Sequence, residues 1–193
     1  MRQAIGLMML LTTLGLQATS LSVENRFSEG KSGKSELVAT LKHGEEVVED
    51  VVVSGHVRVR DGEGYNKIDA RLGVEYKAIS YIRPYLFYDV SSKNSRDEAY
   101  DFSAVLGNYA AIGINGTIYK HGDHGFSYST DIRFSDAEYT ATRSYVKYAY
   151  QMSKDLALYT SIVRRRAEGD KYASETTPSY ADTSGRIGLS YHF

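Results

Sequence analysis

The last nine residues, GRIGLSYHF (Gly185 to Phe193), alternate between two kinds of side chain. In an extended strand, successive side chains point to opposite faces. One face of this segment carries the apolar and aromatic residues Ile187, Leu189, Tyr191 and Phe193. The other carries polar or small residues. This pattern predicts a membrane-crossing strand with one side toward lipid and the other toward water.

Residues 1–18 predict a cleaved signal peptide. Arg2 supplies a positive charge near the N-terminus, and an apolar run extends from Ile5 to Leu16. The small residue Ala18 precedes the expected cleavage site. The alternative is a membrane-anchoring helix, which needs about 20 apolar residues, more than this run offers. We therefore expect the mature domain to comprise residues 19–193.

The composition narrows the class of protein. The chain has 17 Tyr and 17 Gly but no Cys, and 23 basic residues nearly balance 24 acidic ones. A chain without net basicity gives no indication of a nucleic-acid partner. No stretch after residue 18 is apolar enough for a spanning helix. If the protein lies in a membrane, it must cross as strands.

Period-two alternation recurs along the whole mature chain. It predicts an all-β, antiparallel transmembrane barrel of about ten strands, with residues 100–120 counted as one strand. An even number of strands is expected for such a barrel, so twelve strands are the alternative if long strands are split. We expect short periplasmic turns at 43–46, 78–80, 121–125 and 152–155. A soluble sandwich would also alternate, but here tyrosines gather near strand ends, as in an aromatic girdle. The predicted strands are 21–28, 36–42, 50–60, 68–77, 81–90, 100–120, 126–135, 139–151, 156–166 and 185–193.

The polar face of these strands is richer in basic than in acidic residues. Its acidic members are Glu24, Glu36, Asp50, Asp69, Glu75, Asp89 and Asp131. Lys42 and Lys77 are also expected on this face. The residues predicted to line a solute path are Arg26, Arg58, Arg60, Arg71, Arg83, Arg133, Arg143, Lys147, Arg165 and Arg186.

Arginine suits a path for anions. Its guanidinium stays ionised, presents a planar fork to carboxylates and stacks on flat faces, so rows of arginine can pass an acidic oligosaccharide along. The alternative is that these cations pair with inward acids and plug a narrow barrel that serves a structural or adhesive role. The sequence leaves both possibilities open.

Three stretches carry a family resemblance: SVENRFSEGKSGKSELVATLKHG (22–44), YIRPYLFYDV (81–90) and DTSGRIGLSYHF (182–193). Together they resemble the oligogalacturonate-specific porins. The resemblance implies a monomeric barrel in the outer membrane of a Gram-negative bacterium, an arginine-lined lumen and acidic oligosaccharides as solutes. Arg26 and Arg83 match the family's inward arginines best.

The terminal strand also resembles the signature of bacterial outer-membrane proteins, which typically end in Phe preceded by alternating apolar residues. That resemblance implies recognition by the barrel-assembly machinery. In this chain the matching residues are Ile187, Leu189, Tyr191 and Phe193.

An enzyme is the competing class of function. Some small barrels are lipid A-modifying hydrolases that use His and Ser, and His124 and Ser127 stand close together in HGDHGFSYS (121–129). The expected topology puts this turn in the periplasm, away from outer-leaflet lipid. We therefore expect no enzymatic activity, no catalytic residues, no metal site and no cofactor.

Overall fold

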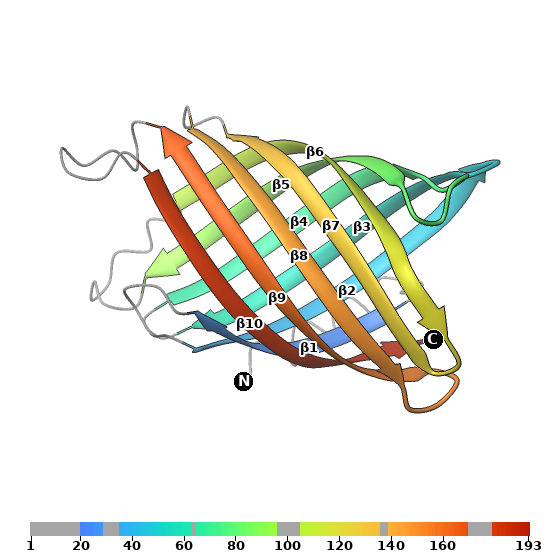
Figure 1. Ribbon diagram of the computed structural model, residues 1–193. Coiled ribbons are helices and arrows are strands. Elements are labelled where there is room, and N and C mark those ends of the chain that lie inside the picture. Colours follow the sequence, from blue (N-terminus) through green and yellow to red (C-terminus); the bar gives the residue numbers. More distant parts are fainter. Residues whose placement is uncertain (1–19, 29–34, 63–64, 96–104, 136–138, 170–178) are drawn as a thin grey trace.

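The computed structural model is a closed barrel of ten antiparallel strands, which confirms the predicted fold class and strand number (Figure 1). The structure describes residues 20–28, 35–62, 65–95, 105–135, 139–169 and 179–193. Each strand pairs with its sequence neighbours, and β1 closes the barrel against β10. The strands are β1 (Ser20–Ser28), β2 (Ser35–Val48), β3 (Val51–Gly62), β4 (Tyr65–Tyr76), β5 (Arg83–Ser95), β6 (Val105–His121), β7 (His124–Ser135), β8 (Tyr139–Gln151), β9 (Leu156–Gly169) and β10 (Ser179–His192).

Side chains alternate between the two surfaces of the barrel. On β4, Leu72 is 63% exposed on the outer surface, whereas Asp69 is fully buried on the inner one. Several other strands repeat this inversion of the usual core, with aliphatic side chains exposed outside and charged ones buried inside. Lipid is the solvent that favours such an outer surface, and closing the sheet satisfies the backbone groups that lipid cannot. No helix within the described ranges has the length and apolar character needed to cross a bilayer.

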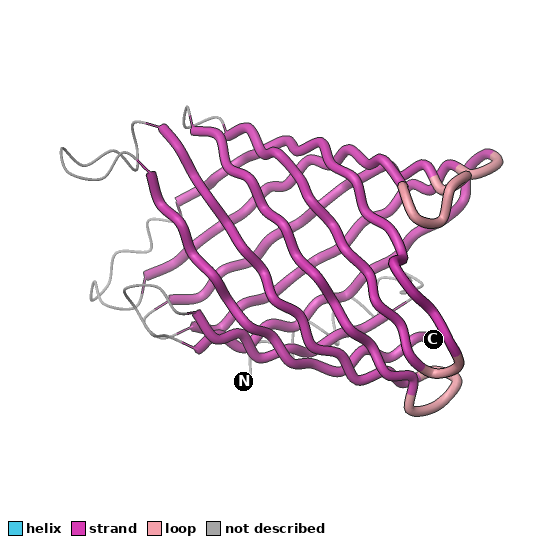
Figure 2. Tube along the Cα trace, viewed as in Figure 1, coloured by secondary structure: helices cyan, strands magenta, loops and turns pink. Residues whose placement is uncertain are grey.

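The two ends of the barrel differ. Turns at 49–50, 77–82, 122–123 and 152–155 gather at one end, where β10 also ends (Figure 2). At the opposite end of the barrel, β5 and β9 end and β6 and β10 begin. Outer-membrane barrels keep short turns in the periplasm and long loops outside. The end that carries the four short turns is therefore expected to face the periplasm, and the opposite end to face outward.

The prediction of a turn at 43–46 is wrong. Glu45 and Glu46 continue β2, and the chain reverses only at Glu49 and Asp50. The valines on both sides of this turn favour extended structure and keep the ladder going, with a bulge between Glu46 and Val48. Asp50, expected in the lumen, instead has a φ of 62° in the turn, where its backbone N–H donates to the Glu46 carboxylate at 3.1 Å.

Candidate solute pathway in the barrel interior

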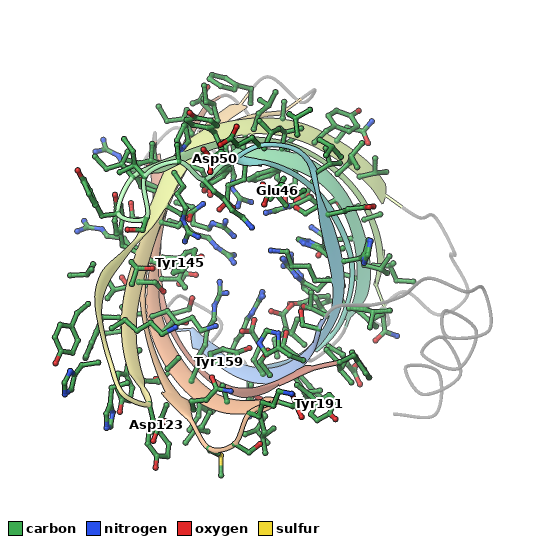
Figure 3. All side chains as sticks on the ribbon, turned by 90° about the vertical axis from the view of Figure 1, so that its right-hand side faces the viewer. Glu46, Asp50, Asp123, Tyr145, Tyr159 and Tyr191 are labelled. Carbon is green, nitrogen blue, oxygen red and sulfur yellow. The ribbon has the colours of Figure 1, made fainter. Side chains whose placement is uncertain are left out.

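The inner surface of the barrel is lined by basic and aromatic side chains. In the view along the barrel, Tyr145 and Tyr159 point inward, Tyr191 points outward, and nitrogen-bearing side chains reach inward from around the wall (Figure 3). Strand alternation and ion pairing place ten expected basic residues on this surface: Arg26, Arg58, Arg60, Arg71, Arg83, Arg133, Arg143, Lys147, Arg165 and Arg186.

One arc of ion pairs joins β10, β1 and β2. Arg26 lies between two carboxylates, with Nη2 2.6 Å from Glu24 and Nη1 3.1 Å from Glu36. Arg186 approaches the same Glu24 oxygen at 3.5 Å. The side chains of Arg26 and Glu24 are about nine-tenths buried. Each carboxylate therefore compensates a desolvated guanidinium from a neighbouring position, as buried charges require.

The arc continues across β3 and β4. Arg60 binds Asp69 at 2.6 Å and lies 4.0 Å from Glu36, and Lys67 lies 3.4 Å from the other Asp69 oxygen. The Asp69 side chain is fully buried. Asp69 thus holds two cations at once, so the arc carries more positive than negative charge.

A second arc runs from β4 to β8. Arg71 forms a bidentate pair with Asp89, through N–O distances of 2.7 and 2.6 Å. Asp131 binds Arg133 on its own strand and Arg143 on the next, the latter at 2.8 and 3.1 Å. Asp131 is only 2% exposed. Its single negative charge is again shared by two guanidinium groups.

Several inward cations have no carboxylate partner within the described part of the chain. Arg58 contacts the Nε2 atom of His56 at 3.1 Å, and Lys147 lies 4.1 Å from the ring centroid of Tyr159. Arg165 stands opposite Arg143 on β8 and opposite the inward Asp182 on β10, with no close ion pair between Arg165 and that carboxylate. These cations add to the positive charge left over by the shared carboxylates.

Aromatic rings lie between the arginines on one wall. The guanidinium of Arg71 sits 3.4 Å from the centroid of Phe87, and that of Arg133 lies 5.3 Å from it. Tyr85 stacks on Phe87 at 5.8 Å, and Tyr109 meets it edge-on at 6.1 Å. Alternation predicts that Tyr85 and Phe87 face inward, but the contact with Tyr109 depends on pairing between strands. Phe87 is only 4% exposed, so its ring is packed between a guanidinium group and the other aromatic side chains.

Three tyrosines reach over a glycine to a carboxylate two strands away. Tyr159 lies opposite Gly188, which lies opposite Glu24, and the Tyr159 hydroxyl donates to Glu24 at 2.9 Å. Tyr85 crosses Gly113 in the same way and donates to Asp131 at 3.0 Å. The third such tyrosine, Tyr65, crosses Gly62 and donates to Glu36 at 2.8 Å. Because glycine lacks a Cβ, the ring can lie directly on the sheet.

The periplasmic half of the interior contains a cavity of about 140 Å³. Lys42 lines this cavity and is exposed although it lies on the inner surface, so water reaches that side chain. Other lining residues are His56, Arg71, Glu75, Tyr85, Asn115, Arg143 and Tyr145.

The two residues considered for hydrolysis do not form a described pair. The exposed His124 bonds through Nδ1 to the Tyr148 hydroxyl at 2.8 Å, and its ring packs on Tyr148 and Tyr150. Ser127 lies on the inner face of β7. Across the described ranges, no group of His, Cys, Asp and Glu is arranged to hold a metal ion.

The terminal strand exposes its apolar face on the outer surface. Ile187, Leu189, Tyr191 and Phe193 are 44–72% exposed, and the last two rings meet edge-on at 5.2 Å. These residues contribute little to the described interior. They are available to lipid and to other proteins.

Deleting Phe193 is expected to lower the yield of assembled barrel several-fold, because the proposed assembly signal would lose its last residue. The measurement is the fraction of heat-resistant, fast-migrating protein in outer membranes. Phe134→Ser is the matched control, because Phe134 is also an outward aromatic side chain, 51% exposed, but lies far from the terminus. Equal yields from the deletion and the wild type would contradict a role for Phe193 in assembly.

Comparison with solved structures shows the same fold in known porins. The "KdgM porin in complex with disordered oligogalacturonate" aligns with a TM-score of 0.52 and 12% identity, over 90% of this chain and 99% of that one. The NanC porin aligns with a TM-score of 0.52 and 14% identity, over 90% and 100%. LpxR from Salmonella typhimurium aligns with a TM-score of 0.51 and 8% identity, over 90% of this chain and 100% of that one. No protein-family model matches the sequence, and no curated protein is found to match it.

The closed barrel, its apolar outer surface and its charged interior define an outer-membrane β-barrel protein. Its architecture is shared with the KdgM and NanC porins. The resemblance seen in the sequence is confirmed at the level of the fold.

Proposed function

We propose that the barrel is a passive channel for small anionic solutes, and that acidic oligosaccharides such as oligogalacturonates are its natural class of solute. One observation carries the proposal: inward cations outnumber the carboxylates that compensate them. Glu24, Asp69 and Asp131 each serve two cations, while Arg58 and Arg165 have no carboxylate partner among the described residues.

Uncompensated cations on the wall make the potential in the lumen positive. Low-dielectric walls focus this potential, which raises the local concentration of anions and disfavours cations. The carboxylates remain bound to their arginines and so hold the guanidinium groups in fixed directions. An anion entering the lumen would meet preorganised donors and displace only water.

The aromatic wall supports the choice of sugar acids over simple anions. Tyr85, which lines the interior cavity together with Arg71 and Arg143, presents an aromatic ring there, whereas a chloride path would need only charge. A sugar ring could stack on such a face while its carboxylate binds a neighbouring guanidinium. The oligogalacturonate named with the KdgM porin belongs to that protein, and its chemistry agrees with this proposal.

A plugged structural barrel is the second candidate function. Asp69, Asp89 and their arginines form close ion pairs with no exposed carboxylate surface, and such pairs could occlude a narrow barrel. The two functions differ in one measurable property. A plugged barrel shows no steady conductance in a planar bilayer.

Replacing Arg58 and Arg165 together with Gln is expected to lower the anion-to-cation permeability ratio several-fold in 0.1 M salt. At 1 M salt the effect should shrink, because the Debye length falls from about 10 Å to about 3 Å. The measurement is the reversal potential across a planar bilayer under a salt gradient. The double variant Arg164→Gln and Arg166→Gln is the matched control, because it removes the same charge from exposed side chains that point away from the lumen.

Absence of a steady wild-type current would contradict the channel and favour the plugged barrel. An unchanged permeability ratio in the Arg58 and Arg165 variant would contradict the anion path. A separate measurement tests the class of solute. Trigalacturonate should interrupt the wild-type current at a lower concentration than neutral maltotriose does. Equal effects of the two sugars would leave an anion channel without preference for sugar acids.

A further inference from the structure

The outer surface of β9 changes character toward its external end. Outward positions carry Leu158 and Ile162, which are 38% and 65% exposed, and then Arg164 and Arg166, which are also exposed. These two arginines point away from the lumen, because they alternate with the inward residues Val163 and Arg165. They therefore take no part in the proposed solute path.

Hydroxyl groups surround these arginines on both neighbouring strands. Arg164 stands opposite Ser144 on β8 and Thr183 on β10, and Arg166 stands opposite Thr142. Opposed residues have Cβ atoms about 4.5–5.5 Å apart, so the five side chains form one surface. Within the described residues, no carboxylate pairs with Arg164. We call Thr142, Ser144, Arg164, Arg166 and Thr183 the outer basic patch.

Large aromatic side chains flank the outer basic patch. On one side, Phe134 of β7 stands opposite Thr140 of β8 and is 51% exposed. On the other side, Phe27 of β1 stands opposite Gly185 of β10 and is 50% exposed. The patch thus interrupts a mainly apolar part of the outer surface. It does so in the external half of the barrel, near the outer leaflet.

A cation facing lipid needs a compensating partner, and no described carboxylate supplies one for Arg164. Arginine on the lipid face of a barrel is costly at the bilayer midplane and is tolerated much better near an interface. The outer leaflet of this membrane contains lipopolysaccharide, whose lipid A carries phosphate groups on its sugar headgroup. Guanidinium groups bind phosphate through paired hydrogen bonds, and hydroxyls can donate further ones.

We propose that the outer basic patch is a binding site for a phosphate of lipid A. Arg164 and Arg166 hold the phosphate, hydroxyls of Ser144 and Thr183 donate to its remaining oxygens, and acyl chains lie against Ile162 and Leu158. The charge of the patch, its position beside apolar residues and its external location together select this lipid over a second copy of the chain.

The test uses the folded barrel in detergent micelles, titrated with bisphosphorylated lipid A and followed by native mass spectrometry. The wild type should bind at least one lipid A. Arg164→Gln combined with Arg166→Gln should weaken binding about tenfold to thirtyfold, because two surface cations are lost. Arg164→Lys combined with Arg166→Lys keeps the charge and should recover part of the affinity. Lys120→Gln with Lys154→Gln is the charge-matched control and should bind as the wild type does.

Two further probes identify the group that is bound. Dephosphorylated lipid A should bind no better to the wild type than to the glutamine variant. Phosphatidylglycerol, which carries one phosphodiester, should bind more weakly than bisphosphorylated lipid A. Equal binding of all three lipids, or unchanged lipid A binding in the glutamine variant, would overturn the proposal. Channel selectivity should be the same in the glutamine variant, so failure here is separable from failure of the proposed channel.

Discussion

Asp131→Asn is expected to lower the free energy of unfolding of the barrel by about 3–5 kcal/mol, the usual cost of removing one partner from a buried ion pair. Asp131 is 2% exposed and binds both Arg133 and Arg143, while also accepting a hydrogen bond from Tyr85. Asparagine keeps the shape but removes the charge, so two guanidinium groups would face each other without compensation. Urea titration of the folded barrel in lipid vesicles measures the loss.

Two further variants test the cause of that loss. Asp123→Asn removes the same charge from an exposed turn and should change stability by less than about 0.5 kcal/mol. Adding Arg143→Gln to Asp131→Asn should restore part of the stability, because only one unpaired guanidinium then remains. If Asp131→Asn were as stable as the wild type, water in the lumen would be compensating both arginines, and the ion pair would not stabilise the barrel.

The barrel can be predicted from the sequence because apolar and polar residues alternate along each strand. Alternation alone places Arg26, Arg133 and Arg186 inside and Ile187 and Leu189 outside, as the structure has them. Counting 100–120 as a single strand gives the correct total of ten, since β6 spans Val105–His121 without a turn. Period-two patterning determines the face of each side chain wherever the strand is known.

Turn position is harder to predict, as the β2–β3 hairpin shows. Polar residues at 43–46 indicate a turn, yet Glu45 and Glu46 pair with Val53 and Val52 in the ladder. Such residues are tolerated in a strand that extends past the apolar band into water. Composition does not distinguish a polar strand end from a turn, so the prediction ended this strand too early.

The ion-pair partners cannot be predicted from alternation. Tyr159 and Glu24 lie 135 positions apart, and their hydrogen bond depends on the register of β9 against β10 and of β10 against β1. The sequence shows that a glycine faces inward at 188, but not that a ring covers it. The outer basic patch was also missed, although Arg164 and Arg166 alternate with Arg165 in the sequence itself.

The shared carboxylates connect stability with the proposed channel. In a lumen lined only by unpaired cations, the cations would repel one another. A lumen with equal numbers of positive and negative charges would attract no anions. Sharing Asp131 between Arg133 and Arg143 reduces the repulsion while leaving net positive charge on the wall. Tyr85 fixes the carboxylate from the opposite side, so the position of the tyrosine ring over Gly113 affects both properties.

Gly113→Ala is therefore expected to destabilise the barrel by about 1–3 kcal/mol, the range for an overpacked site. A Cβ at Gly113 would meet the Thr130 carbonyl oxygen and, at 2.7 Å, the Tyr85 ring, so backbone or ring must move. Gly185→Ala is the matched control, because nothing lies within 4 Å of a Cβ there, and its stability should change by less than about 1 kcal/mol. Urea titration compares the two variants, and anion selectivity of Gly113→Ala shows whether displacing Tyr85 also disturbs Asp131. Equal stabilities would mean that the Tyr85 ring does not rest on Gly113, and unchanged anion selectivity in Gly113→Ala would mean that displacing Tyr85 does not disturb Asp131.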